Sequence, residues 1–432
     1  MGRLRPKPMK PIDDSLAADD PRAPAPWTFP FRPTLSPRLY WILLALCFVL
    51  GCYLRLFPKE EFRGVGWDEH FYTVYVDDLS KHGITNYPVF CQYYLERQRK
   101  DDKAILPPTR FLFIAAASLW RSATGTDSYR ALVHVSFFFS MLALAATAGF
   151  ARRIGGPGLA IVTTALMSVT MNQIHQTHHA MIDGFFTFWC LLGLWSLWEN
   201  LTQPDRRVWL WTYGLSLGAM VLTKENSFFV VCAFCGLIAI NRWIRFGTVR
   251  PSLLLATVLG PLTGFVLLLI LAGGPGVFIE MYRLLVEKSK VLPYAVLTGD
   301  GPWYRYLFDL VLISPLVMVL AIGRSFQVRA EDKAPIFLLA FIGITFAIMA
   351  NIKYGINLRY ATIWDMPLRF LAGAMLLQFG ARFGRYAMLV SIVLVLGLTA
   401  FEANQFYIFC VHNKAYSLVD PELLRAVKIL KP

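Results

Sequence analysis

The chain has 432 residues, of which 56% are hydrophobic and 16% are charged, and its formal net charge is +14. Soluble domains average about 25% charged residues, so this composition excludes an ordinary soluble domain and indicates a membrane protein. The basic residues are scattered in short clusters between apolar runs, which is how membrane topology is signalled. We therefore exclude nucleic acid as a partner.

The succession of apolar runs along the chain predicts an all-α polytopic membrane protein. Residues 1–36 are basic and proline-rich, so we expect a disordered cytoplasmic tail. The apolar runs that follow match the length of about 20 residues that a helix needs to cross the hydrocarbon core. We expect a transmembrane domain over 37–401 and a short external tail over 402–432. The expected spans are 38–57, 128–150, 157–174, 183–199, 208–222, 227–241, 252–272, 303–323, 334–350, 362–380 and 386–401.

Basic clusters occur in alternate loops and share one side with the basic N-terminal segment. Because Lys and Arg are enriched on the cytoplasmic side, we predict a cytoplasmic N-terminus. The loops lack features that point to the endoplasmic reticulum, so we expect the bacterial inner membrane. The external side then carries loops 58–127, 175–182, 223–226, 273–302 and 351–361, with the C-terminal tail.

The first external loop contains a second apolar segment, residues 105–120, which opens with Pro107-Pro108. If this segment crossed the membrane, every later basic cluster would change sides. We therefore interpret it as an interfacial helix, with the prolines at its start, where a missing N–H does no harm. Further interfacial helices are expected to begin at Asp68 and to cover 277–290, where apolar and charged residues alternate.

Ionisable residues gather at the external ends of different spans. Charges near the hydrocarbon cost about 2.5–3.5 kcal/mol at a helix centre, so several of them indicate one shared polar cavity. A carboxylate there can act as general base on a hydroxyl group, and a lysine with an arginine can hold a phosphate. These residues are Asp68, Glu69, Asp183, Lys224, Arg359 and Tyr360.

Each of these residues also has a structural interpretation that the sequence leaves open. Asp68 could be the N-cap of its helix, and Glu69 could be a first-turn charge favoured by the helix dipole. Lys224 could extend from a helix end toward the membrane surface. Arg359 could be an interface anchor, and Asp183 could cap the span that follows it.

Three histidines precede Asp183, with spacings of three and four residues. Such spacing places side chains on one helix face and is compatible with zinc, although interfacial histidines without a metal are the commoner case. The sequence therefore leaves a divalent cation open and predicts no cofactor firmly. The three residues are His175, His178 and His179.

Several short motifs, taken together, resemble those of the GT-C glycosyltransferases. The similarity is greatest to the protein O-mannosyltransferase and lipid A aminoarabinose transferase branch, and it covers about residues 38–370. Each motif alone is weak, and their order and common side carry the resemblance. The motifs are Trp67-Asp68-Glu69, Pro107-Pro108, Asp183, Thr223-Lys224 and Arg359-Tyr360.

The resemblance implies a GT-C-type fold with about 11 transmembrane helices and interfacial helices in the first external loop. It implies transfer of a monosaccharide, with inversion, from a polyprenyl- or dolichyl-phosphate sugar to a hydroxyl of a lipid, glycan or protein. Asp68, with Glu69 beside it, would be the base, and Lys224 with Arg359 would bind the donor phosphate. The pocket for the acceptor would include Asp183, His178, His179 and Tyr360.

The chain departs from the family pattern in two places. Ile105-Leu106 precedes the paired prolines where the family often has a histidine or an acidic residue, and His178 or His179 stands where an arginine is common. Two other classes of function stay open. A lipid or small-anion transporter or flippase would use the same charged cavity without chemistry, and a non-catalytic relative would serve as an assembly subunit.

Overall fold

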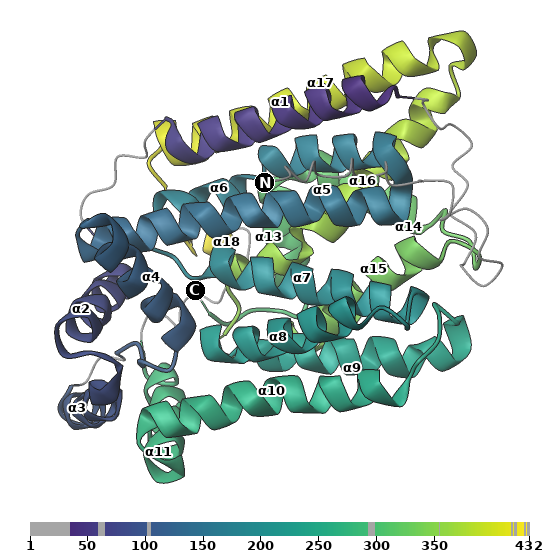
Figure 1. The fold of residues 1–432 in the computed structure, drawn as a ribbon. Helices are drawn as coiled ribbons and strands as arrows, with labels where there is room; N and C mark the ends of the chain where they lie inside the picture. Colours follow the sequence, from purple (N-terminus) through teal and green to yellow (C-terminus); the bar gives the residue numbers. More distant parts are fainter. Residues whose placement is uncertain are drawn as a thin grey trace, which may run out of the picture.

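The computed structural model describes residues 35–58, 65–101, 105–292, 299–353 and 355–415, with 418, 421–426 and 429. The expected tail over 1–36 lies almost wholly outside these residues. Throughout the described part the secondary structure is helical, which confirms the all-α class (Figure 1). The helices are α1 (Pro37–Leu56), α2 (Trp67–His82), α3 (Tyr87–Lys100), α4 (Phe111–Thr124), α5 (Ser128–Ser168), α6 (Met171–His178), α7 (Asp183–Thr202), α8 (Arg207–Thr223), α9 (Ser227–Ile244), α10 (Pro251–Ala272), α11 (Pro275–Ser289), α13 (Arg305–Ile313), α14 (Pro315–Ser325), α15 (Lys333–Met349), α16 (Asp365–Ala381), α17 (Ala387–Phe406) and α18 (Pro421–Ala426), with short η elements between some of them.

Among the described residues, five helical segments are long and apolar enough to cross a membrane: α1, α5, α9, α10 and the segment 384–412 that contains α17. The protein is therefore a multi-pass membrane protein, as predicted. The expected number of about 11 spans is not confirmed, because several of the other apolar helices, such as α14 and α15, are shorter than 18 residues. The last long helix also continues to Phe406, past the expected boundary at 401.

Two helices of the bundle approach so closely that only glycine fits between them. α8 packs against α7 on one side and α10 on the other. A Cβ atom on Gly264 of α10 would lie 2.6 Å from the carbonyl oxygen of Gly218 in α8, and one on Gly260 would lie 2.7 Å from that of Gly214. Small residues at this spacing let helix backbones come together in membranes. This contact fixes α8, whose C-terminal end leads into Lys224.

Short helices gather at one end of the bundle, where α2, α3, α4 and α11 lie together (Figure 1). Their apolar faces share one buried cluster around Phe71, Tyr72 and Phe113. α4 has 14 residues, about 21 Å at about 1.5 Å per residue. This length is well short of the hydrocarbon core of about 30 Å, and the interfacial position of α4 stays a prediction. The helix begins at Phe111 rather than at the prolines, which precede it in a turn.

Three expected spans are shaped differently from the prediction. The span over 303–323 is two helices, α13 and α14, which break at Ser314 before Pro315, because a residue before proline is pushed out of the helical conformation. The segment 157–174 follows a break at Gly156, which has a φ of 78°, and its helix ends at Ser168. The span over 362–380 starts as the 3-10 helix η3 (Leu358–Trp364) before α16.

Candidate active site

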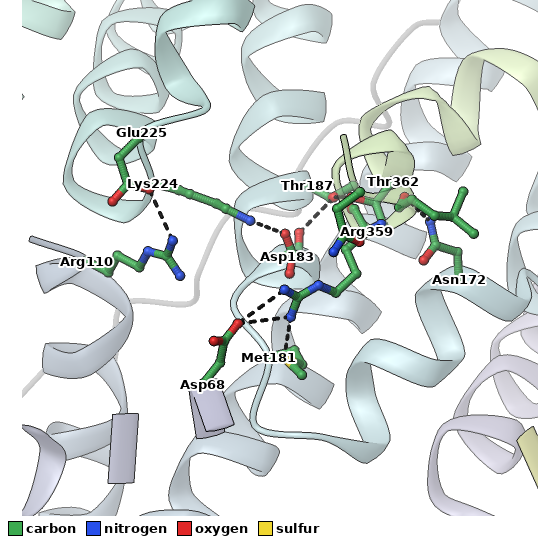
Figure 2. Close-up of polar contacts among 12 residues, drawn as sticks. Asp68, Arg110, Asn172, Met181, Asp183, Thr187, Lys224, Glu225, Arg359 and Thr362 are labelled. Carbon is green, nitrogen blue, oxygen red and sulfur yellow. Dashed lines mark hydrogen bonds and ion pairs between the residues drawn. The ribbon is translucent and has the colours of Figure 1, made fainter. Parts of the chain in front are cut away.

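Asp68 lies in the first turn of α2 and points toward Arg359, 291 residues away in the sequence (Figure 2). Both terminal nitrogens of the Arg359 guanidinium donate to Oδ2 of Asp68, at 3.1 and 3.2 Å. The N-cap of α2 is Gly66, so the interpretation of Asp68 as a helix cap is wrong. Both side chains are about one quarter exposed, so water reaches the pair.

Glu69, the neighbouring carboxylate, is turned into the protein and is 1% exposed. Its Oε2 accepts from the backbone N–H of Gly66 at 2.6 Å, and its Oε1 accepts from that of Ala180 at 2.8 Å. His179 and Tyr129 also contact Oε1, at 3.1 and 3.4 Å. Burial alone would raise the pKa of Glu69, but these partners hold the pKa below its usual value. Glu69 therefore anchors the start of α2 to the segment before α7.

Asp183 and Lys224 form a second ion pair, and both side chains are only 3% exposed. Asp183 is the first residue of α7, and Lys224 is the residue at which α8 ends. The Lys224 ammonium also lies 4.1 Å from the centre of the Tyr360 ring, a cation–π contact. Such contacts stabilise a desolvated cation by about 2 kcal/mol or more. Within the described residues, Oδ2 of Asp183 is buried and has no hydrogen-bond partner.

The 3-10 helix η3 holds Arg359 and Tyr360 in place through contacts with α6 and α7. Asn172 donates to the carbonyl oxygen of Leu358 at 3.3 Å, and Thr187 donates to the Thr362 hydroxyl at 2.8 Å (Figure 2). Gln173 donates to Oδ2 of Asp365, the first residue of α16, at 2.9 Å. These donors come from sequence positions more than 170 residues from η3. The segment from α6 to Asp183 thus connects η3, which carries Arg359 and Tyr360, with the Asp183–Lys224 pair.

A third ion pair, Arg110 with Glu225, lies beside Lys224, and the sequence analysis did not identify it as part of the site. Arg110 Nη2 contacts the Glu225 carboxylate at 3.3 Å, and Nη1 donates to the Tyr72 hydroxyl. Glu225 follows Lys224 directly, and one residue separates Arg110 from the paired prolines. Their only sequence signal is therefore that they lie close to predicted motifs. Figure 2 shows Arg110 across from Asp68.

The three ion pairs place three cations and three carboxylates near one another. The pKa of Lys224 is lowered to about 8, first by burial and also by Arg110 and Arg359, while Asp183 opposes this shift. Burial alone would raise the pKa of Glu225, but Arg110 and Lys224 hold it below its usual value. The charged groups therefore shift one another's pKa values, as expected for one shared site.

The three candidate histidines do not form a metal site. His178 Nε2 lies 2.9 Å from the carbonyl oxygen of Leu54 in α1, while His179 Nδ1 is bonded to Glu69. The His175 and His179 rings contact each other at 4.8 Å. Across the described ranges, no three His, Cys, Asp or Glu side chains are placed to hold a metal ion, so the structure does not support the zinc interpretation. His178 contacts α1 and Phe406, and His179 contacts Glu69.

Comparison with protein families finds a similarity over the central part of the chain. The family model described as dolichyl-phosphate-mannose-protein mannosyltransferase matches residues 71–273. This range includes Asp183, Lys224 and Arg110, and it excludes Asp68 and Arg359. No curated protein matches the sequence.

Solved structures show the same fold at low sequence identity. ArnT from Cupriavidus metallidurans bound to undecaprenyl phosphate has a TM-score of 0.51 and 14% identity, over 86% of this chain and 76% of that chain. The apo oligosaccharyltransferase from Archaeoglobus fulgidus has a TM-score of 0.57 and 12% identity, over 91% and 58%. AglB from the same organism, in complex with an inhibitory peptide and a dolichol-phosphate, has a TM-score of 0.55 and 13% identity, over 88% and 56%.

This chain covers 60% of the chain of apo ArnT, 58% of that of the apo oligosaccharyltransferase and 56% of that of AglB. The family model confirms the predicted resemblance to the O-mannosyltransferase branch for residues 71–273. The solved structures confirm the predicted GT-C fold for most of the chain.

Proposed function

We propose that the protein is a membrane glycosyltransferase that moves a monosaccharide from a polyprenyl-phosphate sugar to a hydroxyl acceptor. The observation that carries this proposal is the convergence of Asp68 and Arg359 beside the Asp183–Lys224 pair (Figure 2). These four residues come from separate elements of the chain. A partly exposed carboxylate next to two buried or half-buried cations suits a reaction that deprotonates a hydroxyl and releases a phosphate.

Lys224 and Arg359 are the groups that we assign to the donor phosphate. The guanidinium offers two parallel N–H donors, which match the geometry of a phosphate, and the ammonium supplies a compact charge. Arg110 is close enough to affect the pKa of Lys224 and adds a third cation to the same region. The presence of undecaprenyl phosphate in the ArnT structure and of dolichol-phosphate in the AglB complex supports a lipid-phosphate donor.

Asp68 is the residue that we assign as general base. In the proposed step, Asp68 takes the proton of the acceptor hydroxyl while the hydroxyl oxygen attacks the anomeric carbon of the donor. The bond between that carbon and the phosphate oxygen breaks, and the polyprenyl phosphate leaves with its negative charge held by Lys224 and Arg359. Attack opposite the leaving group inverts the anomeric centre. General bases contribute about 10²–10⁴-fold to such steps.

Glu69 and the remaining candidates receive different roles in this proposal. Glu69 holds the first turn of α2 in position and has no free oxygen to act as a base. Asp183 and Tyr360 keep the Lys224 side chain in place. We place the site on the external face of a bacterial inner membrane, with a cytoplasmic N-terminus, because of the distribution of basic clusters in the loops.

The experiment that tests the proposal separates transfer from transport. Purified protein in proteoliposomes is given a polyprenyl-phosphate mannose with a radiolabelled sugar and a mixture of peptide, glycan and lipid A acceptors. A glycosyltransferase produces labelled acceptor and free polyprenyl phosphate in equal amounts. A transporter or flippase moves the intact donor between leaflets and leaves the sugar–phosphate bond unbroken, and this result would overturn the proposal. If mannose is not transferred, the same assay with aminoarabinose tests the second branch of the resemblance.

A further inference from the structure

Every cation of the site is already paired with a carboxylate in the resting structure. Lys224 pairs with Asp183, Arg110 with Glu225, and Arg359 with Asp68. An arriving phosphate therefore meets an electroneutral site and must take at least one cation from its carboxylate. Which pair opens decides how binding is coupled to chemistry.

The three pairs differ in how strongly the protein holds them. The side chains of Lys224 and Asp183 are 3% exposed, and opening this pair would leave buried charges uncompensated. Arg110 is 10% exposed and is also hydrogen-bonded to Tyr72. Arg359 and Asp68 are 24% and 26% exposed, so water can solvate both groups as they separate. Solvent-accessible pairs are the least costly to break.

The geometry of the most exposed pair makes it a competitor for phosphate. Arg359 directs both terminal nitrogens at one oxygen of Asp68, so the paired N–H face that would bind two phosphate oxygens is occupied. A guanidinium uses that same face for carboxylate and for phosphate. The base and the leaving group of the proposed reaction therefore compete for one side chain.

We propose that the donor phosphate displaces Asp68 from Arg359, so that the base becomes available to the acceptor only after the donor has bound. This inference rests on the proposed function and adds an order of binding to it. Without donor, Oδ2 of Asp68 accepts two charge-assisted hydrogen bonds from Arg359, which hold the carboxylate against the guanidinium. With donor, the phosphate neutralises Arg359, and Asp68 is released next to the anomeric carbon that the acceptor attacks. The donor binds first and the acceptor second.

A binding experiment with undecaprenyl phosphate as the probe tests the competition, because this ligand has the lipid phosphate but no sugar. Wild type, Asp68→Asn and Glu280→Gln are titrated in detergent micelles by native mass spectrometry. Removing the competing carboxylate in Asp68→Asn should tighten binding about three- to fivefold, the scale of a partly exposed ion pair. Glu280→Gln removes the same charge from the surface of α11, where Glu280 pairs with Arg99 and Arg283, and should leave the affinity unchanged.

A double-mutant cycle separates competition for Arg359 from a general charge effect. In an Arg359→Gln background, Asp68→Asn should produce no further gain, because no cation is left to release. An equal gain in both backgrounds would overturn the inference, as would unchanged or weaker binding by Asp68→Asn in the presence of Arg359. If wild type does not bind undecaprenyl phosphate at all, the proposed function itself fails, and this outcome is distinct from the others.

Discussion

Replacing Lys224 with alanine is expected to destabilise the protein strongly, because the residue is half of a buried ion pair. Lys224 and Asp183 are both 3% exposed, and removing one partner of such a pair costs about 3–5 kcal/mol. Arg359 and Arg110 remain near Asp183 and offset part of its charge, so we expect the lower end, about 3 kcal/mol. At about 2 °C per kcal/mol for a large chain, Lys224→Ala should lower the Tm by about 6 °C.

The measurement is thermal unfolding in detergent, followed by intrinsic tryptophan fluorescence. The double variant Lys224→Met with Asp183→Asn removes both charges and should recover more than half of the lost stability. Asp205→Asn breaks an exposed pair with Arg250 and should change Tm by no more than about 2 °C, because exposed pairs contribute about 0–1 kcal/mol. If the Tm of Lys224→Ala equals that of wild type, or if the Tm of the double variant is no higher than that of Lys224→Ala, the argument from burial is refuted.

Three other predictions follow from particular contacts. The Lys224 pKa of about 8 means that the phosphate-binding ammonium is present below pH 8 and lost above it, so kcat/KM for the donor should fall about tenfold per pH unit above pH 8; a flat profile to pH 10 would contradict the role of Lys224. Glu69→Gln should lower Tm, because it weakens the contacts to Gly66, Ala180 and His179, yet it should keep kcat at least tenfold above that of Asp68→Asn; equal losses of kcat would instead make Glu69 a catalytic group. Gly264→Ala should destabilise the α8–α10 contact, whereas Gly343→Ala, with no atom within 4 Å of the added Cβ, should not; equal Tm values for the two variants would show that the close approach is not required.

The sequence predicted the principal charged residues of the site because each lies at the end of an apolar run on one expected side of the membrane. Asp68, Asp183, Lys224 and Arg359 could be placed together on that basis and on the family resemblance. The roles of Glu69 and Arg110 could not be predicted, because their partners are distant in the sequence. Glu69 contacts Ala180, 111 positions away, and Arg110 contacts Glu225, 115 positions away. Hydropathy gives the depth of a residue in the membrane but not its partner.

Fold details were predictable where the signal is local and were missed where it is not. The apolar runs gave α1, α9 and α10 to within three residues at each end. The break before Pro315 did have a local signal, which the hydropathy of 303–323 outweighed. The short helix α6 is almost entirely buried although it contains Asn172, Gln173 and Gln176, and its polar composition favours a loop in any sequence-based assignment. Its helical form depends on packing against α1, α5, α7, α17 and η3.

The transfer assay on Asp68→Asn tests the central claim most directly, provided that donor binding is measured on the same preparation. The substitution keeps the shape of the side chain and removes its ability to accept a proton. The account predicts that Asp68→Asn binds the polyprenyl-phosphate sugar at least as well as wild type but transfers sugar about 10²–10⁴-fold more slowly. Transfer at a rate near wild type, from a protein that is folded and loaded with donor, would contradict the assignment of Asp68 as the base.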